Sequence, residues 1–494
     1  MALPTAFRRR PRPRPWLAAA LLASAAALAT AQPSPAPEHA DTWRALSRLG
    51  YGPTPELIEQ VRQAGGARAW ALRQIDIAAR DSLLPPPLDG LADDFNAPLP
   101  DIFTQFAQER EARRALRAAP ASAPAAAPAQ PPYSFRVARQ AAGWRLHACS
   151  RPALENPLLA RLTEFWFNHF NVSDDKDPAR PFVGHYAVHA IRAHALGRFD
   201  ALLLASARHP AMLSYLDQAQ SVAEGTLQGQ RPRGLNENYA RELMELHTLG
   251  ANGGYTQQDV RELARVLTGW TLGPNQPDGF RFAARLHDAG VKTVLGQRLG
   301  GPGDAQAGEG EGLAALRLLA AQPATARRVA LRLAQWFVAD QPPPALVEQL
   351  ARSFQASRGD LRAVLRTLVQ APAFWDPAHA LFKTPYDYAC SALAAAGGPA
   401  DEREVTQVLA QLQRAGQSVD RWPTPDGYQT DAATWLAPEA LARRADFAMQ
   451  LARRQPDVEF LATFLSPTLR QRIDSQPPPL RATLLLASPG FMRK

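Results

Sequence analysis

The chain has 494 residues, of which 46% are hydrophobic and 20% charged, so it is long enough to bury a substantial core. Its formal net charge is +9, but five of these nine positive charges come from arginines within the first 14 residues, which leaves +4 for the remainder. This mild positive charge, with no run of basic and aromatic residues after residue 32, is not typical of nucleic-acid-binding proteins. We therefore expect no nucleic-acid partner.

The N-terminus has the pattern of a secretory signal peptide. Arginines precede an apolar stretch from Trp16 to Ala29, and Ala29-Thr30-Ala31 matches a signal-peptidase site. We therefore predict cleavage after Ala31 and a periplasmic or secreted protein with no stable membrane span after cleavage. An uncleaved membrane anchor is the alternative, and adjacent arginines leave twin-arginine export open beside ordinary secretion.

The chain divides by composition into five parts. A signal peptide (1–31) precedes an N-terminal helical segment (32–117), in which Thr54 as N-cap, Pro55 at the first helical position and Gly65-Gly66 at the end delimit one helix. The Ala/Pro-rich residues 118–132 cannot bury a core, so they are predicted to be a disordered linker. A central helical body (133–380) and a C-terminal helical region (381–494) complete the chain.

The central body is predicted to be almost entirely helical. Its apolar periodicity indicates helices at about 154–172, 181–196, 198–206, 209–217, 236–249, 257–268, 313–321, 323–338, 343–357 and 360–370. The helical pattern is interrupted at 279–296, where alternating residues predict a small β-hairpin. We therefore expect a mainly α fold, a large multi-helix orthogonal bundle with a small β-hairpin insertion.

Two cysteines, Cys149 and Cys390, follow the signal peptide. In an oxidising compartment they either form a disulfide or remain as two buried thiols, and the sequence does not decide between these. The absence of a C-x-x-C motif excludes zinc ribbons and thioredoxin-like chemistry.

The predicted helix 236–249 carries the densest polar pattern of the chain. In an unbroken α-helix, Asn238, Glu242 and Glu245 form one stripe, whereas His247 lies away from Glu245. Carboxylate and amide oxygens form a hard ligand set, so these three residues are a hypothetical site for Ca²⁺, Mg²⁺ or Mn²⁺. The simpler interpretation is an ordinary capped helix, begun by Asn236 or Asn238 and ended by Gly250.

Three further residues are candidates for acid–base catalysis. His169 lies on the apolar face that Leu162, Phe165 and Trp166 define, where a histidine is more often a core residue. His287 and Asp288 are adjacent in the predicted hairpin, where such a pair serves catalysis or an ordinary turn. No nucleophile elbow, phosphate-binding loop or dinucleotide fingerprint accompanies them.

Several long segments together resemble the bacterial Domain of Unknown Function 1800 family. They are, in chain order, RLGYGPTP, FWFNHFNV, NENYARELMELHTLGANGGYTQQDVRELARVLTGW, FRFAARLHDAGVKTVLG, PATARRVALRLAQWFVAD and PTPDGYQTDAATWL. The resemblance implies a mainly helical exported protein without an established activity, whose genes often neighbour those of the Domain of Unknown Function 1501 family, a sulfatase- or phosphatase-like fold. The family pattern has His and Lys where this chain has Gln322 and Arg332, which puts a catalytic histidine at position 322 in doubt.

Two functions are therefore carried forward. The first is an exported accessory or scaffold protein that acts with an exported hydrolase-like partner, a protein of the Domain of Unknown Function 1501 family. The alternative is a metal-dependent hydrolase that uses the Asn/Glu/Glu helix face with His169, His287 and Asp288. A third, weaker interpretation is carbohydrate binding through Trp422, Tyr428 and Trp435.

Overall fold

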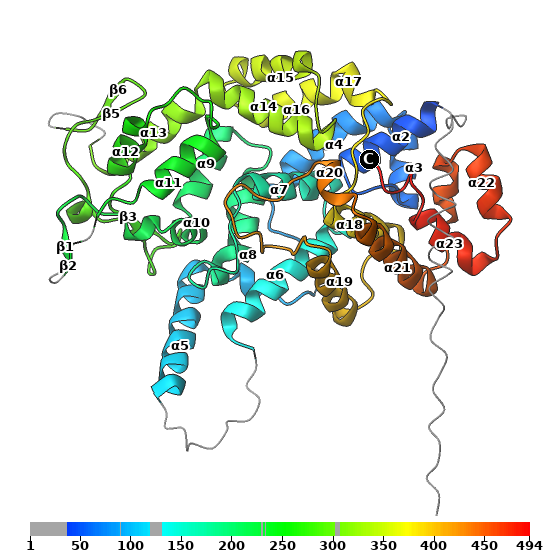
Figure 1. Cartoon of the computed structure of the whole chain (residues 1–494), viewed down its shortest axis with the longest axis horizontal. Helices are drawn as coiled ribbons and strands as arrows, with labels where there is room; N and C mark the ends of the chain where they lie inside the picture. The colour runs from blue at the N-terminus through cyan, green and yellow to red at the C-terminus, as the bar shows by residue number, and fades with distance from the viewer. Residues whose placement is uncertain (1–36, 89, 119–130, 229–230, 233, 302–306) are drawn as a thin grey trace, which may run out of the picture.

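The computed structural model describes residues 37–88, 90–118, 131–228, 231–232, 234–301 and 307–494. The predicted signal peptide and most of the predicted linker lie outside these residues. Helices dominate the described chain, which confirms the mainly α class (Figure 1). None of its helices is long and apolar enough to cross a membrane.

The first half of the described chain contains the helices α2 (Pro37–Arg48), α3 (Pro55–Gln63), α4 (Ala67–Asp81), α5 (Leu99–Ala118), α6 (Tyr133–Ser150), α7 (Pro157–His169), α8 (Val183–His185), α9 (Phe199–Arg208), α10 (Pro210–Tyr215), α11 (Glu237–Glu242) and α12 (Gln257–Val266). Two of its helical segments are π-helices, η3 (Tyr186–Ile191) and η6 (Leu243–His247), and four are short 3₁₀ segments, η1 (Asp94–Asn96), η2 (Arg180–Phe182), η4 (Arg192–His194) and η5 (Gln218–Gln220).

The second half contains α13 (Glu309–Ala320), α14 (Pro323–Phe337), α15 (Pro344–Ala356), α16 (Leu361–Gln370), α17 (Pro372–Trp375), α18 (Pro385–Ala395), α19 (Glu402–Arg414), α20 (Ala432–Trp435), α21 (Pro438–Arg454), α22 (Pro467–Asp474) and α23 (Pro478–Leu486), with the 3₁₀ segments η7 (Ala284–Leu286) and η8 (Glu459–Phe464).

Capping residues mark the helix boundaries, among them the predicted N-cap Thr54. Thr54 Oγ1 accepts a hydrogen bond from the Leu57 backbone N–H at 3.2 Å, and Pro55 occupies the first turn of α3. Thr256 and Asp259 form the reciprocal capping box of α12. Such caps satisfy backbone N–H groups that have no partner within the helix, and each contributes about 1 kcal/mol.

Helix α7 lies at the centre of the larger hydrophobic core. Leu162, Phe165, Trp166 and His169 are all buried, as their shared face predicts, and the opposite face is buried too. This core draws on residues from Ala45 to Trp375, whereas a second cluster draws mainly on residues between 382 and 492. Because other helices surround α7, they hold its last turn, which borders the candidate site, in a fixed position.

The predicted hairpin at 279–296 is wrong in its pairing. Three antiparallel two-stranded pairs occur in the described chain: β1 (Leu227–Gln228) with β2 (Arg231–Pro232), β3 (Trp270–Leu272) with β4 (Phe280–Phe282), and β5 (Lys292–Val294) with β6 (Gln297–Leu299). The strands near 280 and 292 thus belong to two different hairpins. Leu295 and Gly296 both have positive φ, as a two-residue hairpin turn requires, so β5 pairs with the strand that follows it.

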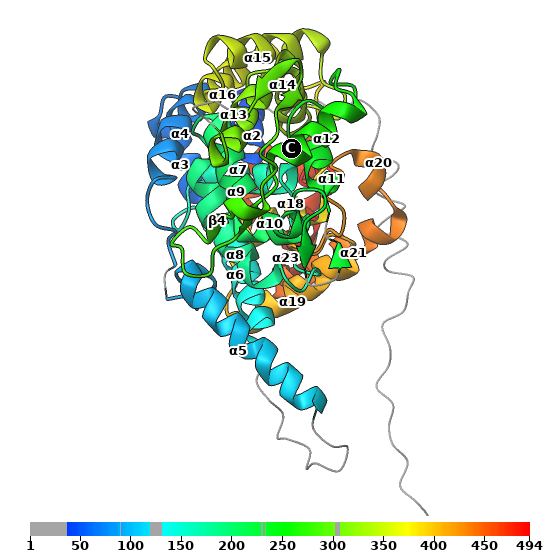
Figure 2. The same ribbon diagram turned by 90° about the vertical axis from the view of Figure 1, so that its left-hand side faces the viewer.

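Two views show how the elements are arranged. Helices α14, α15 and α16 lie side by side above α7, and α21 packs against α23 (Figure 1). Helix α5 extends away from the other helices in both views (Figure 2). Its buried side chains, Leu99, Ile102 and Phe106, all come from its first half. The remainder of α5 therefore contributes little to either core.

Candidate functional site

Four segments that are far apart in sequence meet beside the C-terminal end of α7. His169 Nε2 lies 3.1 Å from the backbone oxygen of His247 in η6, and Arg328 Nε of α14 donates to the backbone oxygen of Leu246 at 2.7 Å. Asn168 Nδ2 donates to the backbone oxygen of Tyr428 at 3.0 Å. These contacts join α7, the α11–η6 helix, α14 and the loop 420–431.

The helix 236–249 is not an unbroken α-helix, which corrects the prediction. It begins as α11, capped by Asn236, and changes to the π-helix η6 at Leu243. Thr248 Oγ1 donates to the backbone oxygen of Leu243 at 2.6 Å, and the Gly250 N–H donates to that of Met244 at 3.0 Å. Single π-helical turns are rare, and those that occur are frequently found at functional sites. The turn at Leu243 therefore favours a functional role for this region.

The two histidines of the site are buried and neutral. Burial lowers the pKa of His169 well below its ordinary value, and Arg328 and Arg332 lower it further. Burial, and then Arg328, also lowers the pKa of His247 to about 3. Within the described chain, His247 Nε2 has no hydrogen-bond partner. His169 is thus held by a backbone contact, whereas the ring of His247 keeps one unused polar atom.

Glu242 and Glu245 are half-buried and influence each other. Burial raises the pKa of Glu242, and the charge of Glu245 raises it further. Asn238 is exposed, and its backbone N–H donates to Asn236 Oδ1 at 3.0 Å. The structure therefore brings the two glutamates together, with Asn238 on the preceding α-helical turn.

Arg328 and Arg332 place two guanidinium groups in this region, where Glu245 acts on Arg328 and Asp426 on Arg332. They are four residues apart on α14, so they share one helix face. Burial, followed by the neighbouring charge of Arg332, lowers the pKa of Arg328 to about 10, while Glu245 raises it. Burial lowers the pKa of Arg332, which Asp426 raises. Neither arginine forms an ion pair within 4 Å in the part of the chain that the structure describes.

We call Glu242, Glu245, Arg328, Arg332 and Asp426 the arginine–glutamate cluster. Its members come from three segments and interact electrostatically, but none forms an ion pair within 4 Å in the described chain. Arg328 donates to the backbone oxygen of Leu246, and the exposed Asp426 accepts hydrogen bonds from Trp422 and Thr424 of its own loop. Charged side chains that are half-buried without a close partner are unfavourable for stability alone. Such a cluster is suited to recognise a ligand or partner that carries charge.

The loop 420–431 is fastened to α7 by polar contacts. Asn171 Nδ2 donates to the backbone oxygens of Trp422 and Thr424, at 3.1 and 2.8 Å. Gly427 has a φ of 72°, and a Cβ atom there would lie 2.2 Å from the backbone oxygen of Asn168. Only glycine allows this close approach, which brings the neighbouring Asp426 near the other members of the cluster.

The aromatic residues of this loop are mostly occupied with internal contacts. The rings of Trp422 and Tyr428 lie 4.6 Å apart, and Tyr428 Oη donates to the backbone oxygen of Ser418 at 2.8 Å. Trp435 is buried, and its Nε1 donates to the backbone oxygen of Gln429 at 2.9 Å. These contacts support the loop, and the suggested carbohydrate binding gains no support from them.

His287 and Asp288 belong to a separate network on the far side of α12. Arg265 Nε donates to Asp288 Oδ2 at 2.8 Å, and this arginine, before any other group, lowers the pKa of Asp288. His287 Nδ1 lies 2.9 Å from the backbone oxygen of Thr268, and its Nε2 lies 3.4 Å from Glu311. The structure thus places His287 and Asp288 together but joins neither to the arginine–glutamate cluster by a contact.

The predicted cation site remains a prediction. In the described chain, no three side chains of the types His, Cys, Asp and Glu lie close enough together to hold a metal ion. The predicted set contains only two such residues, Glu242 and Glu245, so that finding does not test it.

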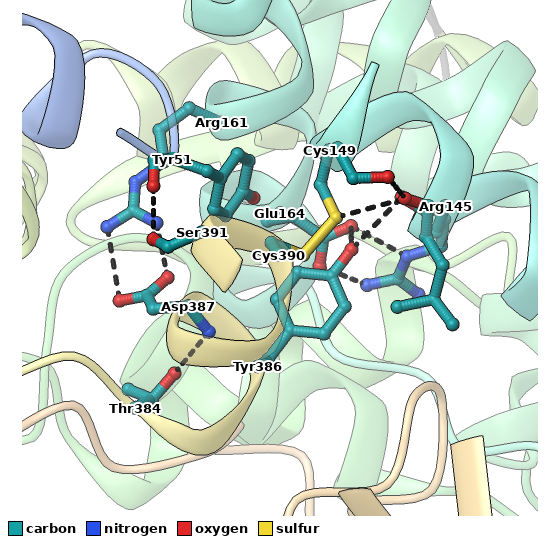
Figure 3. Close-up of a disulfide and its surroundings, with 12 residues drawn as sticks. Tyr51, Arg145, Cys149, Arg161, Glu164, Thr384, Tyr386, Asp387, Cys390 and Ser391 are labelled. Carbon is teal, nitrogen blue, oxygen red and sulfur yellow. Dashed lines mark hydrogen bonds and ion pairs between the residues drawn. A yellow bond between two sulfur atoms is a disulfide. The ribbon is translucent and has the colours of Figure 1, made fainter. Parts of the chain in front are cut away.

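A buried polar centre lies behind the site, around the disulfide that joins Cys149 of α6 to Cys390 of α18 (Figure 3). The pairing resolves the alternatives that the sequence leaves open. On one side of the disulfide, Arg161 pairs with Asp387, and on the other Arg145 pairs with Glu164. These ion pairs link α6, α7 and α18 to one another.

Sequence reasoning missed the two arginines and Asp426. The pattern RRVALR contains a signal, because arginines four residues apart repel each other on one helix face and such a pair calls for a partner. Asp426 has no comparable signal, because only the folded loop brings it to α14. His169, Glu242 and Glu245 lie in the same region, and their predicted roles in catalysis and metal binding stay predictions.

Taken together, these features define a mainly helical protein with a central disulfide and a charged cluster formed by segments that are distant in sequence. The chain belongs to the family described as Protein of unknown function (DUF1800), whose model matches residues 44–493. This match confirms the resemblance that the sequence motifs indicate. Comparison with curated proteins gives no match, and comparison with solved structures gives none.

Proposed function

We propose that the protein is exported and acts as an accessory or scaffold protein for an exported hydrolase-like partner. The Cys149–Cys390 disulfide is the observation that carries the first part of this proposal, because structural disulfides form and persist in oxidising compartments. The predicted signal peptide agrees with it. The proposed location of the protein is the periplasm or the exterior of the cell.

The accessory role is supported by the contacts of the candidate catalytic side chains. His169 lies against the backbone oxygen of His247, Asp288 is held by Arg265, and His287 faces Thr268 and Glu311. Each group is thus committed to an internal contact. The arginine–glutamate cluster, in contrast, retains charged groups that a partner protein would neutralise.

The proposed partner is an exported protein of the Domain of Unknown Function 1501 family. The gene neighbourhood that the family resemblance implies is the reason for this choice. We propose the arginine–glutamate cluster as the surface of contact, because Asp426 is exposed and the other members are partly exposed.

Export is tested by expressing the full chain with its N-terminus intact and separating the periplasm from the cytoplasm. We expect a periplasmic product that begins at Gln32 and contains no free thiol. A full-length cytoplasmic product with two reactive thiols would contradict export.

Partnership is tested by co-purification and titration with the neighbouring gene product. We expect a complex at micromolar concentrations that Asp426→Lys weakens about tenfold or more, because like charges across an interface are unfavourable. Asp474→Lys is the matched control, since Asp474 lies on α22 and is also exposed. The absence of a complex would contradict the accessory role, and equal effects of the two variants would contradict the proposed surface.

A further inference from the structure

A second region of the molecule has the form of a small-molecule site. A cavity of about 500 Å³ opens between α2, the segment that follows α17, η8 and the C-terminal residues. Its wall is mostly apolar and includes the rings of Trp43, Trp375, Phe464 and Phe491. The volume and the apolar wall are typical of sites that enclose small organic ligands.

The charged side chains in the wall of this cavity are predominantly cationic. Four cations line it, Arg44, Arg48, Arg493 and Lys494, and the one acidic side chain is Asp41. Asp41 is already neutralised, because Arg44 Nη1 lies 2.9 Å and Arg68 Nη2 lies 3.6 Å from its carboxylate. Lys494 pairs with Asp387, so the excess positive charge of the cavity lies on Arg48 and Arg493.

Arg48 is the most deeply buried of these cations. Its side chain is 1% exposed, and its two terminal nitrogens donate to the backbone oxygens of Phe374 and His379. Its Nε atom has no hydrogen-bond partner among the described residues, and no described carboxylate lies within ion-pair distance. Burial, and then the charge of Arg44, lowers the pKa of Arg48 to about 9. An anionic group in the cavity would offset the cost of burying this charge.

Lys383 lies behind the aromatic wall, where burial lowers the pKa of its amine well below the ordinary value. Its Nζ lies 5.2 Å from the ring centroid of Trp43 and 4.3 Å from that of Phe491, and it has no hydrogen-bond partner in the described chain. Two of the four rings of the cavity thus pack against a buried lysine, and the positive charge of the cavity comes from its arginines.

We propose that this cavity, the aromatic–arginine pocket, binds a small amphipathic anion whose flat apolar body packs between the rings and whose carboxylate or sulfonate faces the arginines. Shape and apolarity select the body, and Arg48 and Arg493, which have no ion pair among the described residues, select the sign of the charge. The proposal is independent of the accessory role, because the two involve different surfaces and different measurements.

The test is isothermal titration of the purified protein with three probes of one shape. These are 2-naphthoate, the neutral 2-naphthamide and the cationic 2-naphthylmethylammonium. We expect 2-naphthoate to bind at one site per chain, at least about tenfold more tightly than the amide, and the cation not to bind. No binding of 2-naphthoate up to millimolar concentration, or equal binding of all three probes, would overturn the proposal.

Variants locate the bound probe. Arg44→Gln and Arg493→Gln are expected to weaken 2-naphthoate several-fold and to leave the amide unchanged, and Arg327→Gln on the exposed face of α14 is the matched control. Gly490→Phe is expected to abolish binding of both probes by filling the cavity. An added Cβ at Gly490 meets no atom within 4 Å, so this variant should fold. Unchanged binding to a folded Gly490→Phe protein would overturn the assignment.

Discussion

Asp387 of α18 is shared by two cations, Arg161 of α7 and Lys494, although all three side chains are buried. Burial alone would raise the pKa of Asp387, but Arg161 and Lys494 together hold it below its ordinary value. The guanidinium of Arg161 also lies over the rings of Tyr51 and Trp336, at 5.0 and 5.1 Å from their centroids. This one carboxylate therefore joins the two hydrophobic clusters at their boundary.

Replacing Asp387 with Asn should destabilise the protein severely. Two buried cations would lose the only carboxylate that pairs with them among the described residues, and breaking a buried ion pair typically costs about 3–5 kcal/mol. The control is Asp76→Asn, since the side chain of Asp76 is 58% exposed and pairs with Arg366 at the surface. Urea denaturation of both variants measures the difference. Similar midpoints for the two variants would contradict a structural role for Asp387.

Removal of the disulfide should lower the free energy of unfolding by about 2–5 kcal/mol. The cysteines are 241 residues apart in sequence, so the cross-link restricts a large part of the unfolded chain. The measurement compares denaturation of the oxidised protein with that of the Cys149→Ala/Cys390→Ala variant. Reductant should shift the wild-type midpoint and leave that of the double variant unchanged. If both midpoints shifted equally, the reductant would be acting on something other than this bond.

Three neighbouring histidines should make the protein sensitive to acid. The Ala211 N–H donates to Nδ1 of His209 at 3.1 Å, so the ring proton of His209 lies on Nε2, which faces Nδ1 of His185 at 2.9 Å. Burial lowers the pKa of His209 to about 3, with His189 contributing next, and burial also lowers the pKa of His185. Both rings are therefore neutral in the folded protein at neutral pH.

The direction of the pH effect follows from these shifts. Above the ordinary histidine pKa of about 6.5, neither state binds protons at these rings, and stability is at its full value. Between about pH 6.5 and 3 the unfolded chain binds protons that the folded chain excludes, so stability falls by up to about 1.4 kcal/mol per pH unit for each ring. Denaturation at pH 7, 6, 5 and 4 should show a shallower fall for His209→Asn than for the wild type. His39→Asn is the control at an exposed position, and identical slopes for both variants would refute the assignment.

Gly427→Ala should detach the loop 420–431 from α7. The new Cβ would collide with the backbone oxygen of Asn168, in addition to the strain of a positive φ. Gly416→Ala is a matched control, because Gly416 has a φ of 83° and the nearest atom lies 3.9 Å from its added Cβ. Limited proteolysis should cut the loop faster in Gly427→Ala than in Gly416→Ala. Equal rates would mean that the close approach at Asn168 does not hold the loop.

The predicted cation site at Glu242 and Glu245 has a direct test. A divalent ion there would relieve the repulsion between the carboxylates, so millimolar Ca²⁺, Mg²⁺ or Mn²⁺ should raise the midpoint of thermal unfolding, and a chelator should reverse the rise. Glu242→Gln should abolish the effect, whereas Glu348→Gln on α15 should retain it. If no ion changes the midpoint of the wild-type protein, the site and the hydrolase that depends on it are both rejected.

Local features of the fold could be predicted from the sequence. The helices near 257–268 and 323–338 and the buried face of α7 all follow from apolar periodicity and capping residues, which act within a few positions. Helix α5 lies in the segment predicted to be helical, but its bounds were not predicted, because only its first half carries buried apolar residues. Strand pairing at 270–299 also failed, since each strand had a nearer partner than the one predicted.

Features that depend on distant segments could not be predicted. The π-helical turn at Leu243–His247 is not encoded by a local signal, and it lies where α7 and α14 contact the helix. The pairing of Cys149 with Cys390 likewise depends on the packing of α6 against α18. The candidate site is of this kind, because its five charged residues come from three separate segments.

The disulfide also affects whether the chain stays in one piece after proteolytic cleavage. A single peptide-bond cleavage anywhere between residues 149 and 390 would leave the two fragments covalently joined. In a protease-rich environment outside the cytoplasm, a nicked molecule would retain all of its mass. Electrophoresis without reductant would show a chain of full size, and only reduction would reveal the cut.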